Sequence, residues 1–339
     1  MVNFLPDASV APLTIAPSHP TGHNRERNPG TRLDATAFDS IAINASAVER
    51  RTSSLTARRS VKKEFQAAWL VRALTCIDLT TLSGDDTPAR VSRLCAKAKA
   101  PLSDDLLAAL GLQAEPPKVG AVCVYPTMVA PAVKALQGSG VPVASVASGF
   151  PAGLTPLPIK LAEIRYAVSE GAGEIDIVIS RALVFQREWN ALYDEIAAMR
   201  EACGEARLKT ILATGELKTF RNVYAASMVA MQAGADFIKT STGKEDVNAT
   251  LPVSLVMLRA LRDYRDTTGF DIGFKPAGGI RTAKDSINWL ILMREELGVA
   301  WTRNDLFRFG ASGLLTDIER QLEHFATGRY SAAYRHPMG

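Results

Sequence analysis

Two lysines stand where short apolar runs give way to small polar residues. Lys239 follows Phe237-Ile and precedes Thr-Ser-Thr-Gly, whereas Lys275 follows Ile272-Gly-Phe and precedes Pro-Ala-Gly-Gly. If both runs are neighbouring strands of one parallel sheet, the two nitrogens emerge at the same rim. A lysine with a pKa of about 10.4 is neutral in about one molecule in 2500 at pH 7, and a nearby cation with partial burial can lower that pKa by about 3 units. Such a pair can supply a neutral amine that forms a Schiff base with a carbonyl.

The same two lysines also suit a structural role. Lysines at the rim of a barrel can extend their ammonium groups into water or bind phosphate as simple charges. From these residues alone, we give the nucleophilic and the structural interpretation about equal weight.

A carboxylate interrupts another apolar run. Asp176 lies inside Glu-Ile-Asp-Ile-Val-Ile at 174–179. A buried aspartate is costly unless it is paired, and two lysines facing the same interior are suitable partners. We expect either a structural ion pair or a proton relay through Asp176 and Lys275 beside a nucleophilic Lys239.

Glycine-rich turns indicate a site for a phosphate group. They are Gly243-Lys244, Gly278-Gly279-Ile-Arg281 and Gly310-Ala-Ser312-Gly313. Backbone N–H groups in such turns, and at a helix N-terminus, bind anions. The loops after strands seven and eight are the usual phosphate site of a (β/α)8 barrel. With two basic side chains beside these turns, we predict a phosphorylated substrate.

Alternating strand and helix patterns must position these side chains. Apolar, β-rich runs occur at 73–79, 120–125, 143–148, 174–179, 207–213, 236–240, 271–275 and 307–310. Helical patterns lie at 88–99, 127–138, 157–170, 183–203, 218–233, 250–266, 283–297 and 312–327. Eight strand–helix units predict an α/β protein with a (β/α)8 TIM barrel. The first strand is not followed by the Gly-x-Gly-x-x-Gly turn of a doubly wound sheet.

The chain ends differ from the barrel pattern. We predict a mobile N-terminal tail over 1–35, a helical extension packed on the barrel over 36–72, the catalytic barrel over 73–327 and a C-terminal tail over 328–339. No signal peptide or membrane helix is expected in the Pro-rich start. Basic pairs recur at 50–51, 58–59 and 62–63. A solvated helix face is about three times as probable for them as a partner or targeting surface.

Charge and histidine usage exclude some classes of function. The 339-residue chain has 39 Lys+Arg and 35 Asp+Glu, and the +4 excess lies in residues 1–63. A neutral body argues against nucleic-acid binding. The four histidines, at 19, 23, 324 and 336, cannot gather at the rim, so neither a zinc mechanism nor a cofactor is expected.

Cysteine usage favours a reducing compartment. Cys76, Cys95, Cys123 and Cys203 form no Cys-x-x-Cys pair, and two of them lie in apolar strand-like runs. A reduced thiol packs there as a small apolar group. We therefore predict a cytoplasmic protein.

Five stretches resemble the deoxyribose-phosphate aldolases, which are metal-independent Schiff-base aldolases on a TIM barrel. The stretches are Asp78-Leu-Thr-Thr-Leu, Ala-Thr-Gly-Glu-Leu217, Asp-Phe-Ile-Lys-Thr-Ser-Thr-Gly-Lys244, Gly-Phe-Lys-Pro-Ala-Gly-Gly279 and Phe-Arg-Phe-Gly-Ala-Ser312. The resemblance runs from about residue 72 to 326, and the N-terminal extension is similar to that of animal-type members.

The resemblance implies reversible cleavage of 2-deoxy-D-ribose 5-phosphate to D-glyceraldehyde 3-phosphate and acetaldehyde, in deoxynucleoside catabolism. It implies that Lys239 forms the imine, that Lys275 lowers the pKa of Lys239, and that Asp176 moves protons through water. The implied phosphate contacts are Gly243, Lys244, Gly278, Gly279, Arg281, Gly310 and Ser312. Asp78 and Thr80 would lie near the substrate chain, with Cys123 at the far wall.

Some positions depart from the pattern of bacterial members. Gly313 replaces a second serine, Ala213 replaces a glutamate and Ser83 replaces an asparagine. These changes affect single phosphate or hydroxyl contacts. A C-terminal tyrosine assists proton transfer in some members, and here Tyr330 or Tyr334 would have that part.

Two alternatives remain at this point. One is a Schiff-base aldolase that acts on another phosphosugar. The other is a non-catalytic barrel scaffold whose functional surface is the basic arm of residues 50–63. The expected partners are small phosphosugar and aldehyde substrates, without nucleic acid or membrane, and a homo-oligomer is left open.

Overall fold

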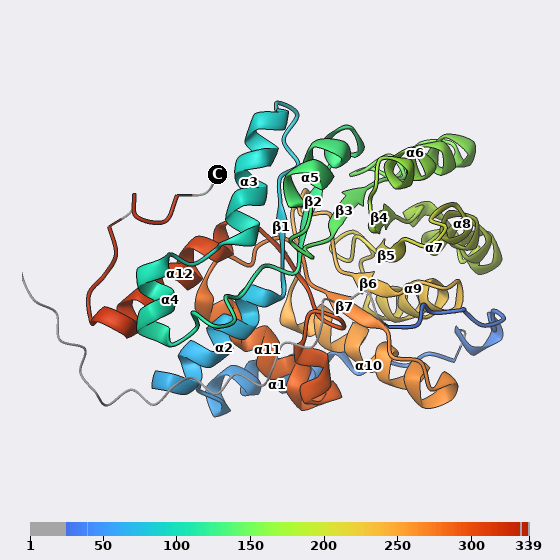
Figure 1. Cartoon of the computed structure of the whole chain (residues 1–339). Helices are drawn as coiled ribbons and strands as arrows, with labels where there is room; N and C mark the ends of the chain where they lie inside the picture. Colours follow the sequence, from blue (N-terminus) through green and yellow to red (C-terminus); the bar gives the residue numbers. More distant parts are fainter. Residues whose placement is uncertain (1–24, 39, 333, 338–339) are drawn as a thin grey trace, which may run out of the picture.

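Eight short parallel strands form a barrel inside a ring of helices (Figure 1). The computed structural model describes residues 25–38, 40–332 and 334–337. The strands are β1 (Ile77–Thr80), β2 (Ala121–Val124), β3 (Val143–Val146), β4 (Glu174–Val178), β5 (Arg207–Ile211), β6 (Phe237–Lys239), β7 (Gly273–Lys275) and β8 (Phe309–Ala311). The predicted (β/α)8 TIM barrel is confirmed.

The strands follow one another around the barrel in chain order. Hydrogen-bonded neighbours run β7-β6-β5-β4-β3-β2-β1-β8. Bridges between Phe274 and Phe307 and between Ala277 and Gly310 connect β7 with the β8 region. In β6 and β7, Lys239 lies opposite Lys275 in the register. The sheet therefore places the two lysines side by side at one level of the barrel.

The helices are mostly those predicted. They are α1 (Ala45–Arg58), α2 (Lys63–Thr75), α3 (Pro88–Lys99), α4 (Asp104–Leu110), α5 (Val129–Leu136), α6 (Leu157–Ser169), α7 (Arg181–Gln186), α8 (Trp189–Ala202), α9 (Phe220–Gln232), α10 (Leu251–Thr268), α11 (Ala283–Leu297) and α12 (Gly313–Thr327). Three 3-10 turns, η1 (Thr36–Phe38), η2 (Pro126–Met128) and η3 (Val299–Thr302), complete the set. Among these described residues, no helix is both long and apolar enough to cross a bilayer.

Threonine side chains start several of the barrel helices. Thr87, Thr219, Thr250 and Thr282 each accept a hydrogen bond from a backbone N–H in the first turn of α3, α9, α10 and α11. This satisfies a donor that has no partner inside the helix. The caps fix where each βα loop ends and therefore shape the rim of the barrel.

Three helical segments differ from the sequence prediction. The segment 183–203 forms two helices, because Arg187 adopts a left-handed conformation with φ of 58° between α7 and α8. The region 36–72 contains η1, α1 and the start of α2, with extended backbone at Arg59 and Lys62 between the two helices. Helix α4 was not predicted, and it ends at Gly111, whose φ is 69°.

Residues 25–35 belong to the stretch predicted as a tail, and they lie against the barrel (Figure 1). Asn28 is 2% exposed, and its amide donates to the carbonyls of Met231 and Ala235. The Asn28 backbone N–H donates to Asp236, and the Tyr264 hydroxyl donates to Oδ1 of the Asn28 side chain. This segment is a packed strap between α9, α10 and the start of β6. Residues 1–24 lie outside the described residues.

Helix α1 uses part of the predicted basic arm for contacts within the protein. Arg51 contacts Glu295 and Glu296, both at 2.9 Å, and Arg59 contacts Glu295 at 2.5 Å. All four charges therefore join the N-terminal extension to α11. Arg50 is exposed. The contacts reduce the free positive charge that a partner surface would require.

The C-terminal segment returns along α12. His336 is 5% exposed and contacts Glu323 at 2.6 Å and Glu319 at 3.4 Å. By contrast, Tyr330 and Tyr334 are 83% and 86% exposed. The role of these tyrosines in proton transfer stays a prediction.

Candidate active site

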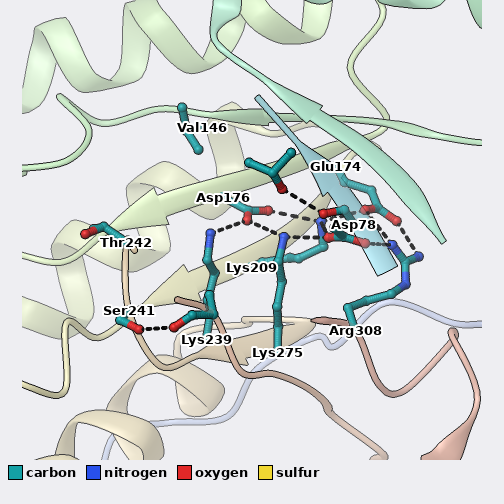
Figure 2. A network of polar contacts seen from close by, with 12 residues as sticks. Asp78, Val146, Glu174, Asp176, Lys209, Lys239, Ser241, Thr242, Lys275 and Arg308 are labelled. Carbon is teal, nitrogen blue, oxygen red and sulfur yellow. Dashed lines mark hydrogen bonds and ion pairs between the residues drawn. The ribbon is translucent and has the colours of Figure 1, made fainter. Parts of the chain in front are cut away.

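One carboxylate oxygen connects the two predicted lysines (Figure 2). Oδ2 of Asp176 accepts hydrogen bonds from Nζ of Lys239 and from Nζ of Lys275, each at 2.8 Å. Lys239 is 3% exposed, and the other two residues are fully buried. The three residues come from β6, β7 and β4. The structure therefore brings together the three side chains that we predicted as catalytic.

A larger ionic network lies beside this trio, and the sequence prediction missed part of it. Lys209 contacts Glu174 at 2.5 Å and the Oδ1 oxygen of Asp176 at 3.0 Å. Arg308 donates to Glu174 at 2.9 Å and to Asp78 at 2.6 Å. Figure 2 shows these residues in continuous contact across the barrel interior.

Asp78 belongs to this network rather than to the open part of the site. Its Oδ2 accepts from Nζ of Lys275 at 2.5 Å, and its Oδ1 faces Arg308. Thr80, two residues further along β1, is half-buried and donates to the Asp78 backbone carbonyl at 2.7 Å. Of the two predicted substrate neighbours, only Thr80 is partly accessible.

The two lysines experience opposite electrostatic environments. Burial lowers the pKa of Lys239; Asp176 opposes that change, and the neighbouring ammonium of Lys275 adds to it, so the pKa ends below its usual value. Burial also acts to lower the pKa of Lys275, but Asp176 and Asp78 outweigh it and raise that pKa above its usual value. Lys239 is therefore the easier of the two amines to deprotonate, and Lys275 is the harder.

The carboxylates of the network stay ionised. Burial alone would raise the pKa of Asp176, but Lys209, Lys239 and Lys275 outweigh it and hold that pKa well below its usual value. The pKa of Asp78 is lowered in the same way, because Lys275 and Arg308 outweigh its burial. An ionised Asp176 between two amines can accept and return a proton.

Two loops of the predicted phosphate site meet above the barrel. A Cβ atom placed on Gly243 would lie 3.9 Å from Cα of Gly278, so the loops after β6 and β7 are in contact. The φ angles of Gly243, Gly278 and Gly279 are 85°, 78° and 81°, a conformation that favours glycine. Lys244 and Arg281 are exposed at these loops. Such turns can direct backbone N–H groups toward an anion.

Small polar side chains hold the two loops together. The hydroxyl of Thr240 accepts from the Ala277 N–H at 3.0 Å, and Ser241 donates to the Ala277 carbonyl at 2.5 Å. Glu245, which the sequence analysis did not identify, accepts from the backbone and hydroxyl of Thr242 at 2.7 and 2.8 Å. These contacts fix the Thr-Ser-Thr-Gly-Lys loop directly after Lys239.

The remaining phosphate candidates lie at β8 and the start of α12. Ser312 is exposed and is the N-cap residue of α12, and its side chain makes no capping hydrogen bond. The Gly310 N–H donates to the carbonyl of Pro276 at 2.9 Å. A Cβ atom on Gly310 would lie 2.7 Å from Cβ of Ala277 and 3.3 Å from Cε of Lys275. Gly310 thus provides room for the loop after β7.

A small apolar cluster forms another wall of the barrel interior. Cys123 from β2 packs with Ala144 and Val146 from β3, and Leu82, Tyr125 and Phe150 pack against this group. Burial raises the pKa of the Cys123 thiol, so it stays protonated. Cys123 lies close enough to Lys239 that an ionised thiol would interact with the amine, but the protonated thiol carries no charge. The amine therefore has an uncharged wall on one side and the ionic network on the other.

Metal coordination is a separate question from the lysine chemistry. Among the described residues, no group of three or more His, Cys, Asp and Glu side chains is arranged to hold a metal ion. The clustered carboxylates Asp78, Glu174 and Asp176 instead contact lysine and arginine nitrogens.

Known proteins share both the sequence and the fold. The DeoC/LacD family of aldolases matches residues 72–307. The human protein named deoxyribose-phosphate aldolase is 61% identical over 320 residues, covering 94% of this chain and 99% of the human protein. Its mouse counterpart is 61% identical over 311 residues, covering 91% of this chain and 98% of the mouse protein.

A solved structure is similar to the whole barrel. The tetrameric deoxyribose phosphate aldolase from Aeropyrum pernix matches with a TM-score of 0.56 at 23% identity, covering 83% of this chain and 99% of that one. At this identity the likeness concerns the fold alone. The barrel that holds the lysines lies within the family match, and the relatives match almost from end to end. The chain therefore belongs to the DeoC/LacD family of aldolases.

Proposed function

We propose that this protein is a deoxyribose-phosphate aldolase, which reversibly cleaves 2-deoxy-D-ribose 5-phosphate to D-glyceraldehyde 3-phosphate and acetaldehyde. The observation that carries the chemistry is the buried Lys239, whose amine shares one oxygen of Asp176 with the ammonium of Lys275. The identity to the human and mouse enzymes supports the substrate.

The reaction begins with attack of neutral Lys239 on the aldehyde carbon of the open-chain sugar. The amine loses a proton and the carbonyl oxygen gains one, giving a carbinolamine. A further proton, taken up by the carbinolamine hydroxyl, allows water to leave, and a protonated imine remains. Asp176, 2.8 Å from the nitrogen, takes and returns these protons directly or through water. Lys275 stays charged and keeps Asp176 ionised between transfers.

Cleavage uses the imine as an electron sink. The C3 hydroxyl loses its proton, the C2–C3 electron pair moves toward the imine, and D-glyceraldehyde 3-phosphate leaves. The two-carbon enamine then gains a proton at C2 and becomes the imine of acetaldehyde. Addition of water to this protonated imine releases acetaldehyde and one proton to solvent, and it returns Lys239 to the neutral amine.

We propose that the phosphate binds where the loops after β6, β7 and β8 meet. The positive φ angles at Gly243, Gly278 and Gly279 support backbone donation, and the exposed charges of Lys244 and Arg281 would neutralise the dianion. Ser312 would donate its hydroxyl at the N-terminus of α12. We assign Gly310 a spatial role, because its N–H already donates to Pro276.

The apolar wall favours a two-carbon fragment without hydroxyl groups. The wall presents apolar carbon and sulfur atoms to the site. They belong to Cys123, Val146 and the aromatic pair Tyr125–Phe150, whose ring centroids are 6.0 Å apart. A fragment with several hydroxyl groups would lose hydrogen bonds to water against this wall. This observation supports acetaldehyde over the donor of another phosphosugar aldolase. Thr80 is the accessible polar side chain that we place near the sugar hydroxyls.

Location and assembly remain proposals. All four cysteines are buried free thiols, which supports a cytoplasmic protein. We propose that its partners are the small substrates, and that it needs neither nucleic acid nor membrane. Formation of a homo-oligomer stays a prediction, as does the division into tail, helical extension, barrel and C-terminal tail.

The test is turnover by the purified full-length chain. Cleavage of 2-deoxy-D-ribose 5-phosphate is measured by reduction of the released triose phosphate, with ribose 5-phosphate and unphosphorylated deoxyribose as comparison substrates. We expect a clear preference for the deoxy phosphate and the same rate with a chelator present. Equal turnover of ribose 5-phosphate would favour another aldolase, and no turnover of any sugar would favour the scaffold alternative.

A further inference from the structure

Seven ionisable side chains that form ion pairs fill the interior of the barrel (Figure 2). The carboxylates are Asp78, Glu174 and Asp176; the basic groups are Lys209, Lys239, Lys275 and Arg308. None of the seven is more than 3% exposed. Arg207 at the start of β5 is also buried, but its strongest charge interaction is with Asp236, so we count it with that carboxylate and not with the seven. They come from β1, β4, β5, β6, β7 and the residue before β8. The strand β2 contributes the neutral thiol of Cys123, and β3 contributes apolar Val146.

The charges of this set balance only when one basic group is neutral. Three carboxylates face four basic groups, so four cations would leave one uncompensated charge in a buried space. Such a charge is costly, and a titratable group will lose or gain a proton to avoid it. With one amine neutral, three negative charges meet three positive ones.

The contacts identify Lys239 as the neutral member. Lys209 lies within 3.4 Å of all three carboxylates, and Lys275 contacts two. Arg308 also contacts two, and guanidinium groups stay charged in proteins. Within the described residues, Lys239 contacts one carboxylate, Asp176. It therefore gains least from holding a proton.

We propose that Lys209 and Glu174 act as positioning residues that set the protonation state of Lys239 through the charge balance of the barrel interior. Both are fully buried; Glu174 lies two residues before Asp176 on β4, and Lys209 lies on the neighbouring strand β5. Lys209 reaches Lys239 through Asp176: it contacts Oδ1, while Lys239 contacts Oδ2. The proposal rests on the imine role of Lys239 given above.

Opposite charge changes should have opposite effects. Lys209→Met removes a cation, so Lys239 retains its proton to match the three carboxylates, and its pKa rises. Glu174→Gln removes a negative charge while keeping a side chain of similar shape, so the pKa of Lys239 falls. The double variant keeps two carboxylates, Asp78 and Asp176, and two cations, Lys275 and Arg308. These charges balance, so Lys239 is again the surplus basic group and its pKa returns toward the wild-type value.

The measurement is the pH dependence of imine formation, which reports on Lys239 itself. The full-length chain is mixed with acetaldehyde and cyanoborohydride between pH 5 and 10, and the rate of ethyl addition to Lys239 is followed by mass spectrometry. A neighbouring charge shifts a pKa by about 1–3 units, so we expect the midpoint of Lys209→Met to move up by at least about one pH unit. Its rate near pH 7 should fall about tenfold or more.

The matched variants separate charge balance from general damage. Glu174→Gln should move the midpoint down, and the double variant should return it to within about half a unit of wild type. Lys160→Met is the control, because Lys160 is also a buried lysine, 1% exposed, but pairs with Glu195 outside the barrel interior. It should leave the midpoint unchanged even if the protein becomes less stable.

Three results would overturn the proposal: unchanged midpoints, single variants that shift in the same direction, or a double variant that does not return. If Lys209→Met does not fold, the other two variants still test the proposal. The pH midpoint should move down in Glu174→Gln and return toward the wild-type midpoint in the double variant. Absence of the adduct in wild type would instead contradict the imine role of Lys239.

Discussion

Asp176 supplies one oxygen to two lysines, so its charge affects both at once. Replacing it with asparagine keeps the shape but removes the proton acceptor. We expect Asp176→Asn to lower kcat by about 10²–10⁴-fold, the usual contribution of a general acid–base group. The measurement is steady-state cleavage of deoxyribose 5-phosphate by the folded variant. A loss of less than about threefold would show that protons move by another route.

The sequence predicts the residues that end or interrupt apolar runs, and this was sufficient for Lys239, Lys275 and Asp176. It does not reveal Lys209, because the alternation in Arg-Leu-Lys-Thr-Ile is also typical of a strand with one face in water. Closure of the barrel turns that polar face inward. Arg308, between Phe307 and Phe309, was missed for a similar reason: its partners come from β1 and β4, far away in the chain.

At the scale of elements, the N-terminal strap is a structural part of the barrel base. The Asn28 amide satisfies two carbonyls at the end of α9 and before β6. We expect Asn28→Ala to lower the free energy of unfolding by about 2–4 kcal/mol, because it leaves buried carbonyls without a donor. Urea unfolding measures this change, and the turnover of the folded variant should stay near that of wild type.

A capping residue nearby provides the control for the strap. Asn44 accepts from the Ala47 N–H at the exposed start of α1, and Asn44→Ala should cost only about 1 kcal/mol. Equal losses for the two variants would contradict a special role of Asn28. A selective loss of turnover in Asn28→Ala would connect the strap to the active site instead.

Element boundaries could be predicted only in part. The repeated alternation of strand and helix patterns predicts the eight units. No glycine or proline lies at the break between α1 and α2. The sequence of residues 36–72 therefore predicts one continuous helical region, whereas the structure has two helices there. Helix α4 is only 7 residues long, although its acidic first turn and Gly111 are ordinary helix signals.

At the scale of the whole molecule, the buried ionic network makes stability depend on pH. The pKa values of Asp78, Glu174 and Asp176 are lowered in the folded protein, because lysines and Arg308 outweigh burial. The stability from these groups is therefore present above their unfolded pKa of about 4 and is lost as pH falls through the folded values.

We expect the free energy of unfolding to fall steeply below about pH 4, with up to about 1.4 kcal/mol per pH unit from each carboxylate. Urea unfolding at several pH values from 3 to 7 measures the slope. Glu174→Gln, which has one titrating group fewer, should show a shallower slope. Identical slopes in the two proteins would mean that Glu174 does not titrate on unfolding.

The number and order of the strand–helix units in the sequence predict the fold class. They do not predict where the two ends of the chain pack on the barrel. Contacts such as Arg51 with Glu295 join residues 244 positions apart, and no local pattern marks them. The same applies to His336 against α12. Long-range ion pairs of this kind depend on the closed barrel, which the sequence predicts only as an architecture.

The central claim is that Lys239 forms an imine with the aldehyde substrate. Its most direct test is borohydride reduction of the full-length protein mixed with acetaldehyde, followed by peptide mass mapping, with Lys239→Ala as the matched variant. We predict one ethyl group on the peptide that contains Lys239 and none in the variant. An adduct on Lys275 alone, or no adduct in the wild-type protein, would contradict the account.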